Sequence, residues 1–346
     1  MKRILAVLLL AALGAAAWAW WELDQPYRGF EQPVTIEFPK GTSTMRMGAQ
    51  LAQQGVVRWG WQFALLRLLR PRARLQAGEY LFKEAASARE VFDRIERGDV
   101  FFYELLVPEG SNIFEIARIV DQMGLIKAEQ FLEAARDTAP IQNLAPKARS
   151  LEGYLFPSTY RLTRHTTAAQ LTRMMVEQFR NVWGQLRTQA DPHQTVTLAS
   201  LVEKETAVGS ERAQVASVYV NRLKKGMKLD CDPTTIYAAL LENRYRGTIF
   251  QSDLDSRHPY NTYRNPGLPP GPIANPGLAS LKAALHPAET DYLYFVAVAG
   301  ANGKHQFSES FAQHQRAVSQ YRRGTGQTKQ TKATGKAPRR GKTRRR

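Results

Sequence analysis

The feature that most constrains this chain is its amino terminus, where no charged residue occurs from Ile4 to Trp21. These 18 residues are Leu, Ala, Val, Ile, Gly and Trp only. A helix of that length rises roughly 27 Å, close to the hydrocarbon thickness of a bilayer, and it is longer than the apolar core of a signal peptide. We therefore expect a transmembrane anchor over residues 4–21.

The residues that flank this stretch predict its orientation. Lys2 and Arg3 precede it, and three tryptophans suited to a membrane interface end it, Trp18, Trp20 and Trp21. Basic residues stay on the cytoplasmic side of a membrane. We expect a single-pass membrane protein with its amino terminus in the cytoplasm and everything after Glu22 outside it. The small residues Ala15–Ala17 leave a cleaved signal peptide open, and the chain is exported in either case.

Charge and cysteine content exclude several classes of protein. The chain has 346 residues and one cysteine, Cys231, so it has neither an internal disulfide nor a cysteine-clustered metal site. The formal net charge is +17, but residues 322–346 hold eleven Lys or Arg and no acidic residue. That composition is typical of a disordered tail, either solvated or in contact with anionic lipid or wall polymer. The remaining body is only mildly basic, and we expect no nucleic-acid partner.

An internal repeat predicts the architecture that follows the anchor. A strand-like segment leads into Pro-x-Gly twice, at 39–41 and 108–110, and each copy ends on Tyr-Leu-Phe, at 80–82 and 154–156. Pro-x-Gly suits a sharp turn from a strand into a helix, so each unit is expected to run strand, helix, helix, strand. This βααβ order resembles the LysM type of glycan-binding module. A repeated packing unit without a ligand is the alternative.

Beyond residue 160 the pattern changes to longer helices, and the whole chain is expected to be α+β. The expected helices are 167–189, 197–207 and 211–225, after which the helices stop. Next come a Pro- and Gly-rich loop (257–277), a hairpin made by a buried strand (292–298) and residues 305–308, and a last helix (311–321). The expected divisions are a cytoplasmic stub (1–3), the anchor (4–21), a linker (22–33), a LysM-like subdomain (34–102), a second βααβ-like unit (103–160), a mixed α/β core (161–321) and a basic disordered tail (322–346).

Motif searches remove several chemistries. The chain contains no P-loop, dinucleotide-binding, zincin, nucleophile-elbow or S-x-x-K motif. Its six histidines show no close ligand spacing. We expect neither a metal nor a cofactor.

One carboxyl group stands out in the helix expected at 197–207. The positions i, i+3, i+4 and i+7 are held by Leu198, Leu201, Val202 and Glu205, so Glu205 lies on the apolar face of the helix. Glu203 points about 200° around the helix from Glu205, to a more polar side. If Glu205 is partly buried without a cation, desolvation raises its pKa and keeps a proton available near neutral pH. That is the property of a general acid. The alternative is a carboxylate paired with an arginine or capped by a backbone group.

Several longer motifs follow one another along the chain: Leu151–Pro157, Ala199–Thr206, Val220–Leu223, Gly226–Leu229, Asp232–Thr234, Tyr260–Tyr263, Gly267–Ile273 and Tyr292–Val296. In these motifs the chain resembles the YceG-like family of endolytic murein transglycosylases, over residues 34 to 321. The resemblance implies a lytic transglycosylase with a LysM-like subdomain that cuts nascent peptidoglycan strands internally. It also implies a bacterial inner (cytoplasmic) membrane as the location, with the catalytic core, residues 161–321, in the periplasm. It also implies that Glu205 is the catalytic acid. Cys231 departs from the family pattern, and we expect a small packed residue that does not touch Glu205.

The same motifs suggest residues that hold the glycan. The candidates are Glu152, Asn221, Asp232, Tyr260, Asn261, Thr262 and Tyr263. For each of them a turn-fixing or packing hydrogen bond is the alternative role. The expected reaction cleaves the MurNAc-GlcNAc β-1,4 bond without water and leaves a 1,6-anhydroMurNAc end. Synthases of the elongation machinery are possible partners, and a non-catalytic wall-binding or scaffold protein is the alternative function.

Overall fold

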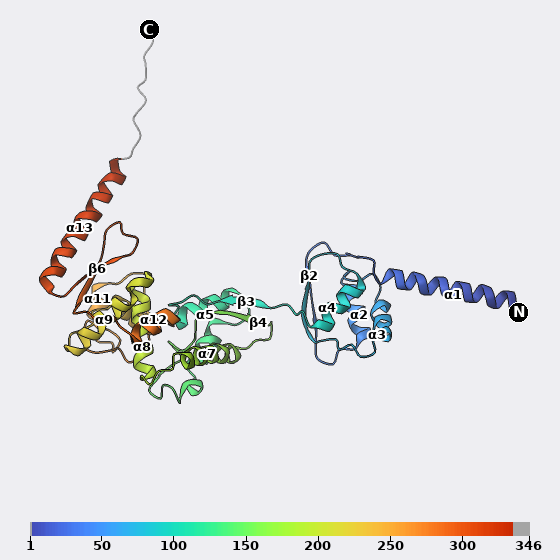
Figure 1. Cartoon of the computed structure of the whole chain (residues 1–346), viewed down its shortest axis with the longest axis horizontal. Helices are drawn as coiled ribbons and strands as arrows, with labels where there is room; N and C mark the ends of the chain where they lie inside the picture. Colours follow the sequence, from blue (N-terminus) through green and yellow to red (C-terminus); the bar gives the residue numbers. More distant parts are fainter. Residues whose placement is uncertain (1, 335–346) are drawn as a thin grey trace, which may run out of the picture. The chain divides into compact units, whose positions relative to one another are not determined.

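The computed structural model describes residues 2–334, and within it the chain forms two compact units (Figure 1). The first comprises Met1–Tyr103 with Arg161–Arg164, and the second Glu104–Tyr160 with His165–Arg346. Both helices and strands are present, as expected for an α+β chain.

The chain begins with helix α1 (Lys2–Glu22), which confirms the expected apolar helix. Among the described residues it is the one helix long and apolar enough to cross a membrane. Its end is tied to the first unit, because Leu23 is fully buried and the side chain of Gln62 donates to the carbonyl of Glu22 at 3.2 Å.

The first unit has the predicted strand, helix, helix, strand order and one further helix. Its elements are β1 (Val34–Phe38), α2 (Thr44–Gln53), α3 (Trp61–Leu69), β2 (Gly78–Phe82) and α4 (Ala88–Arg97). β1 and β2 pair antiparallel with Ile36 opposite Tyr80. Gly41, in the Pro-x-Gly turn after β1, has a φ of +87°, a conformation that glycine adopts without strain. The sequence analysis did not predict α4.

The second copy of the repeat differs from the prediction at its end. Its elements are β3 (Tyr103–Leu106), α5 (Ile113–Gln122), α6 (Ala128–Ala134), a short 3-10 helix (Ala139–Ile141) and β4 (Thr159–Leu162), which pairs with β3. The expected strand at 154–156 is absent, so this part of the prediction was wrong. Tyr154 and Leu155 are fully buried in irregular chain, and the Leu155 amide donates to the side chain of Asn275 instead of to a strand.

The rest of the second unit is mainly helical. Its elements are α7 (Ala168–Gln185), α8 (Pro192–Glu205), a 3-10 turn (Gly209–Glu211), α9 (Arg212–Lys224), α10 (Asp232–Leu241), α11 (Gln251–Leu254), α12 (Leu278–Leu285), β5 (Tyr294–Ala297), β6 (His305–Ser308) and α13 (Phe311–Thr334). The expectation that helices stop after residue 225 until the last one was wrong, since α10, α11 and α12 lie between them. Pro233 suits the first turn of α10, where its missing amide proton is not needed.

The expected hairpin is confirmed, because β5 and β6 pair antiparallel. β5 is only half-buried, which corrects the prediction of a buried strand. α13 continues to Thr334, past the end expected at residue 321, so residues 322–334 are helical. The remainder of the expected tail, 335–346, lies outside the described residues.

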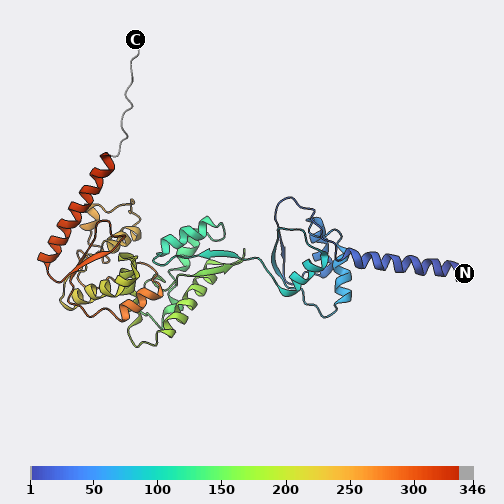
Figure 2. The same ribbon diagram turned by 45° about the horizontal axis from the view of Figure 1, so that its top comes forward.

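The core of the second unit places the end of α8. This helix packs against α9, α10 and α12 (Figure 2). The apolar face predicted for it is confirmed: Leu198, Leu201 and Val202 are buried in one cluster with Tyr219 of α9. Glu205, the last residue of α8, therefore stands at the edge of that cluster.

Candidate active site

A pocket of about 330 Å³ opens at the end of α8 in the second unit. Its lining combines carboxyl groups with aromatic rings and comes from α8, α9, the 229–232 segment, β5 and α13. The residues are Glu205, Tyr219, Arg222, Leu229, Asp230, Asp232, Tyr263, Tyr294, Phe295, Phe311 and His314.

Glu205 is half-buried in this pocket and accepts two hydrogen bonds from uncharged groups. The thiol of Cys231 donates to Glu205 Oε1 at 3.1 Å, and the hydroxyl of Tyr219 is the second donor. Within the described part of the chain, no Lys or Arg forms an ion pair with Glu205. Burial raises the pKa of Glu205, and the charge of Asp232 adds to the effect. Glu205 thus has the environment predicted for a general acid.

Glu203, two residues earlier on α8, has a different environment. Its side chain is only 6% exposed and forms an ion pair with Arg212 at 3.2 Å. Its other oxygen accepts the backbone amide of Gly277 at 2.9 Å. Glu203 therefore faces polar partners, as predicted, although its side chain is enclosed. The two glutamates nevertheless differ as expected, because a cation compensates only Glu203.

Cys231 contacts the candidate acid, which corrects the expectation that it does not. Thr262 holds the segment in place, since its hydroxyl accepts the Cys231 amide at 3.0 Å and bonds the hydroxyl of Thr234 at 2.9 Å. Burial and the neighbouring Glu205 raise the pKa of the Cys231 thiol well above its usual value. The thiol is therefore neutral and acts as a hydrogen-bond donor to Glu205.

Two of the predicted glycan-holding residues line the pocket. Asp232 is the first residue of α10, and the hydroxyl of Tyr263 donates to its Oδ1 at 2.6 Å. Asp232 is exposed, whereas burial raises the pKa of Tyr263. Together these two residues place a carboxylate and an aromatic ring beside Glu205 in the same pocket.

Three other candidates make internal contacts outside this pocket. The side chain of Asn261 is fully buried and donates to three backbone carbonyls within residues 253–256, so it fixes the loop. Asn221 donates to the carbonyls of Thr290 and Tyr292 at 2.7 and 3.1 Å. The ring of Tyr260 packs against that of Tyr237 with centroids 5.1 Å apart.

Glu152 is also separate from the pocket. It is 2% exposed, accepts the Ile113 amide at 2.9 Å and accepts the side-chain amide of Asn275 at 2.8 Å. Burial raises the pKa of Glu152 to about 8, despite these hydrogen bonds and one from Tyr237. This carboxyl group joins the start of α5 to the loop that precedes α12.

The sequence analysis missed the part of the pocket lining that Arg222, Tyr294 and His314 form. The guanidinium of Arg222 lies 5.1 Å from the ring centroid of Tyr294 and donates to the carbonyl of Leu293 at 2.7 Å. The ring of His314, on α13, stacks against Tyr294 at 5.1 Å. Arg222 belongs to a motif noted above, so a signal existed for it. His314 had none, because only the fold brings the last helix to this place.

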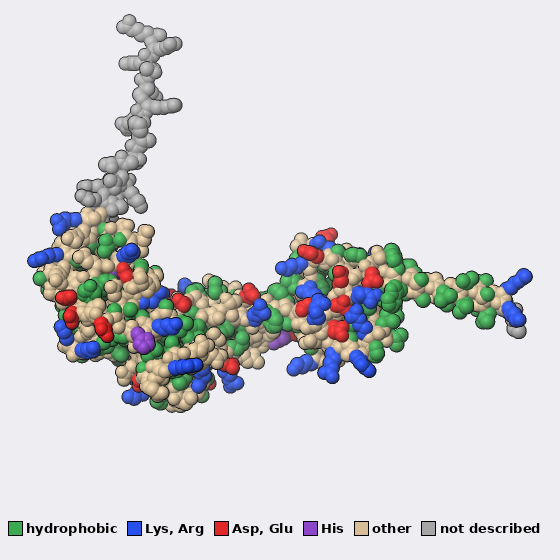
Figure 3. All heavy atoms as spheres, in the orientation of Figure 1, with side chains coloured by type: hydrophobic (Ala, Val, Ile, Leu, Met, Phe, Trp, Pro, Cys, Tyr) green, Lys and Arg blue, Asp and Glu red, His purple; other side chains and the backbone are tan. Residues whose placement is uncertain are grey.

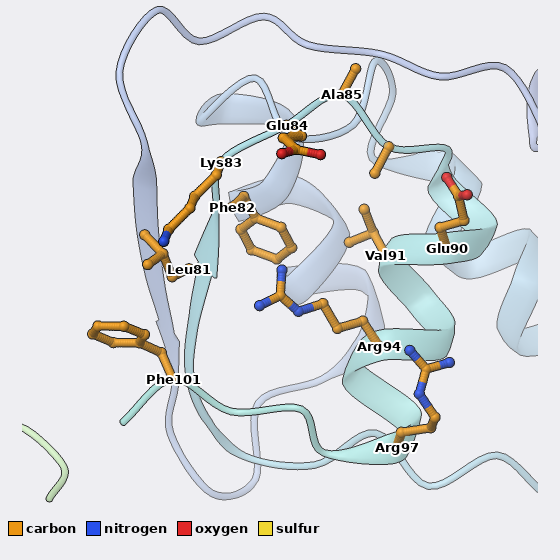
Figure 4. A pocket seen from close by; sticks show the side chains of 11 residues that line it. Leu81, Phe82, Lys83, Glu84, Ala85, Glu90, Val91, Arg94, Arg97 and Phe101 are labelled. Carbon is orange, nitrogen blue, oxygen red and sulfur yellow. The ribbon is translucent and has the colours of Figure 1, made fainter. Parts of the chain in front are cut away.

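The first unit holds a separate pocket of about 630 Å³ between β2 and α4 (Figure 4). Arg94 points into it and lies over the ring of Phe82, 5.2 Å from the centroid. Of its two carboxyl groups, Glu90 is engaged in the capping box of α4 with Ser87, and Glu84 is exposed. Neither has the environment of Glu205. Among residues 2–334 no group of three or more His, Cys, Asp or Glu is placed to hold a metal ion.

Comparison with known proteins agrees with the resemblance seen in the motifs. The profile of the YceG-like family matches residues 36–320. A protein of Bacillus subtilis (strain 168) named endolytic murein transglycosylase is 30% identical over 83% of this chain and 84% of its own. A Streptococcus pneumoniae protein of the same name is 29% identical, and the match spans 58% of its length. The crystal structure of a putative yceG-like protein from Listeria monocytogenes matches 83% of this chain and 99% of its own, at 30% identity and a TM-score of 0.52.

Proposed function

The chain belongs to the YceG-like family, and from this premise we propose that it is an endolytic lytic transglycosylase of peptidoglycan with Glu205 as its acid and base. The observation that carries the proposal is the environment of Glu205: a carboxyl group with a raised pKa, without a paired cation among the described residues, that lines a pocket. The other enclosed glutamate of α8, Glu203, is already paired with Arg212.

In the first step, protonated Glu205 gives its proton to the glycosidic oxygen between N-acetylmuramic acid and N-acetylglucosamine. The bond to the leaving sugar breaks, and the muramic C1 gains oxocarbenium character. A raised pKa favours this step, since the acid must still hold its proton near neutral pH. The hydrogen bonds from Cys231 and Tyr219 then stabilise the carboxylate that forms.

In the second step, the Glu205 carboxylate takes the proton of the muramic C6 hydroxyl, which closes onto C1 as a 1,6-anhydro ring. No water is consumed, so one carboxyl group serves both steps, whereas an ordinary glycosidase requires two. The carboxylate of Asp232 lines the same pocket and is the residue that a hydrolytic mechanism would use as its second group. The hydroxyl of Tyr263 already occupies one of its oxygens.

The location follows from α1. We propose that it anchors the chain in the inner membrane with Lys2 and Arg3 in the cytoplasm, so that both folded units lie in the periplasm where the glycan strands are. Cleavage of nascent strands near the membrane would end their elongation. The β1-α2-α3-β2 unit is proposed to be LysM-like, as its element order indicates.

The test is an analysis of reaction products. Full-length protein in detergent is incubated with uncrosslinked peptidoglycan strands, and the fragments are identified by mass spectrometry. We expect internal fragments that end in anhydromuramic acid from the wild type and none from Glu205→Gln. Glu203→Gln, an isosteric change on the same helix, is the matched control and is expected to cleave.

Each other result would contradict a specific part of the proposal. Fragments with reducing ends would show hydrolysis and assign a second carboxyl group, with Asp232 tested next. Intact strands that still bind the wild-type protein would favour the non-catalytic wall-binding function.

A further inference from the structure

Helix α3 is apolar on two sides, although a surface helix usually has one apolar and one polar face. Its inner side is in the core, where Phe63 and Leu66 are fully buried. Its outer side carries Trp61, Ala64, Leu65 and Leu68, spaced at i, i+3, i+4 and i+7. This second set forms a continuous stripe along the helix, which we call the outer stripe.

Leu65 packs partly against the core and the ring of Trp61 contacts that of Trp18, but the rest of the outer stripe faces away from the protein among the described residues. Leu68 is 77% exposed and Trp61 38%. Trp59, just before the helix, and Leu69, at its end, are also exposed. Single exposed apolar residues are ordinary, but a contiguous set of this kind marks a surface that contacts a protein or a membrane.

The position of α3 identifies a membrane as the partner. The ring of Trp61 lies 6.0 Å from that of Trp18, in the last turns of α1. The next residue, Gln62, donates to the carbonyl of Glu22 at the end of α1. In both ribbon views α3 runs across the direction of α1 instead of along it (Figures 1 and 2). On the face drawn in Figure 3, hydrophobic side chains continue from α1 onto the adjoining edge of this unit.

The charges that follow α3 agree with a lipid surface. Arg72 and Arg74 are exposed, and neither forms a hydrogen bond or an ion pair with any described residue. Arg70, by contrast, pairs with Asp93 and Glu96 of α4. Free guanidinium groups beside an apolar helical stripe are the pattern by which interfacial helices bind anionic headgroups.

We propose that the outer stripe of α3, with Arg72 and Arg74, lies in the headgroup region of the bilayer in which α1 is anchored. This inference rests on the proposed anchoring role of α1. The first unit is then held at the membrane by two helices, the spanning helix α1 and the interfacial helix α3 that runs across its direction. Two such contacts fix the orientation of the unit, which one helix alone leaves free to tilt.

The experiment reads the depth of single labels in the full chain. Cysteine is introduced as Leu68→Cys in the stripe, Ala17→Cys near the end of α1, and Asp99→Cys at an exposed site after α4, and each protein is labelled with bimane. Wild type is the blank, because Cys231 is buried and its thiol pKa is raised. The proteins are reconstituted into phosphatidylcholine and phosphatidylglycerol vesicles that contain a nitroxide lipid quencher.

We expect fluorescence losses of about half at residues 68 and 17, as for labels at the depth of roughly 5–10 Å that interfacial helices reach, and little loss at residue 99. Arg72→Glu with Arg74→Glu should reduce the loss at residue 68 and leave that at residue 17 unchanged. Quenching at residue 17 with none at residue 68 would overturn the α3 contact while the anchor stands. The absence of quenching at residues 17 and 68 would overturn both the α3 contact and the membrane anchor.

Discussion

Burial raises the pKa of two carboxyl groups in the second unit, Glu205 and Glu152, but the two groups differ in their access to a pocket. Glu205 lines a pocket of about 330 Å³ and accepts hydrogen bonds from a thiol and a phenol. Glu152 is sealed in the protein, where a backbone amide and the side chain of Asn275 occupy its oxygens. Both lie in motifs shared with the YceG-like resemblance.

The difference shows that a raised pKa identifies a candidate acid only together with access to a substrate. Desolvation acts on both groups, but only Glu205 has space in front of its oxygens. Glu152 instead crosslinks the turn at Ser111–Ile113 to the loop at Asn275, because its neighbour Asn275 also donates to the carbonyl of Ser111 at 2.8 Å. We therefore propose Glu205 as the catalytic group and a structural role for Glu152.

The largest effect should come from Glu205→Gln. Loss of the only acid and base of the proposed mechanism is expected to lower kcat/KM by about 100- to 10,000-fold. The melting temperature should stay the same or rise, since the change removes a half-buried carboxyl group. Glycan cleavage assays beside thermal melts test both statements. If Glu205→Gln retained more than about a tenth of the wild-type activity, Glu205 would not be the acid and base, and its contrast with Glu152 would not hold.

The next effect concerns stability and pH. Because the pKa of Glu152 is about 8 in the folded protein and near 4.3 in unfolded chains, the folded state binds more protons between these values. The free energy of unfolding should thus fall as pH rises from about 5 to 8, by roughly 2–4 kcal/mol.

Urea unfolding of the full chain across this pH range is the measurement. Glu152→Gln should flatten the dependence, at the cost of one hydrogen bond, since a Gln amide nitrogen cannot accept the Ile113 amide. Glu205 is the other carboxyl group with a raised pKa, so Glu205→Gln is the matched control that separates its contribution from that of Glu152. A wild-type profile that is flat or rises over this range would contradict a neutral Glu152.

The smallest effect is expected at Cys231. Cys231→Ala removes a hydrogen bond that favours the charged form of Glu205, so the pKa of Glu205 should rise further. The alkaline limb of kcat/KM should then move to higher pH, while the maximal rate changes less than about tenfold. A pH-rate profile measures both. A limb that moves to lower pH would show that the thiol does not donate to the carboxylate.

Local pattern was sufficient for much of this molecule. An uncharged run predicted α1, Pro-x-Gly turns predicted the strand-to-helix units, and the 3.6-residue period placed Glu205 on the buried face of α8. Each of these depends on residues within a few turns of one another, where side-chain spacing and backbone preference act directly. The same local reasoning failed at residues 154–156, where buried irregular chain bonded to Asn275 replaced the expected strand.

The tertiary structure alone decided which groups surround the candidate acid. Cys231 and Tyr219 meet Glu205 only when α9 and the start of α10 pack against α8, and His314 arrives from the last helix. Tyr260, Asn261 and Tyr263 belong to one four-residue motif, yet only Tyr263 lines the pocket. The physical reason is that a pKa depends on burial and on neighbours in space, and sequence distance specifies neither once the chain has folded back on itself.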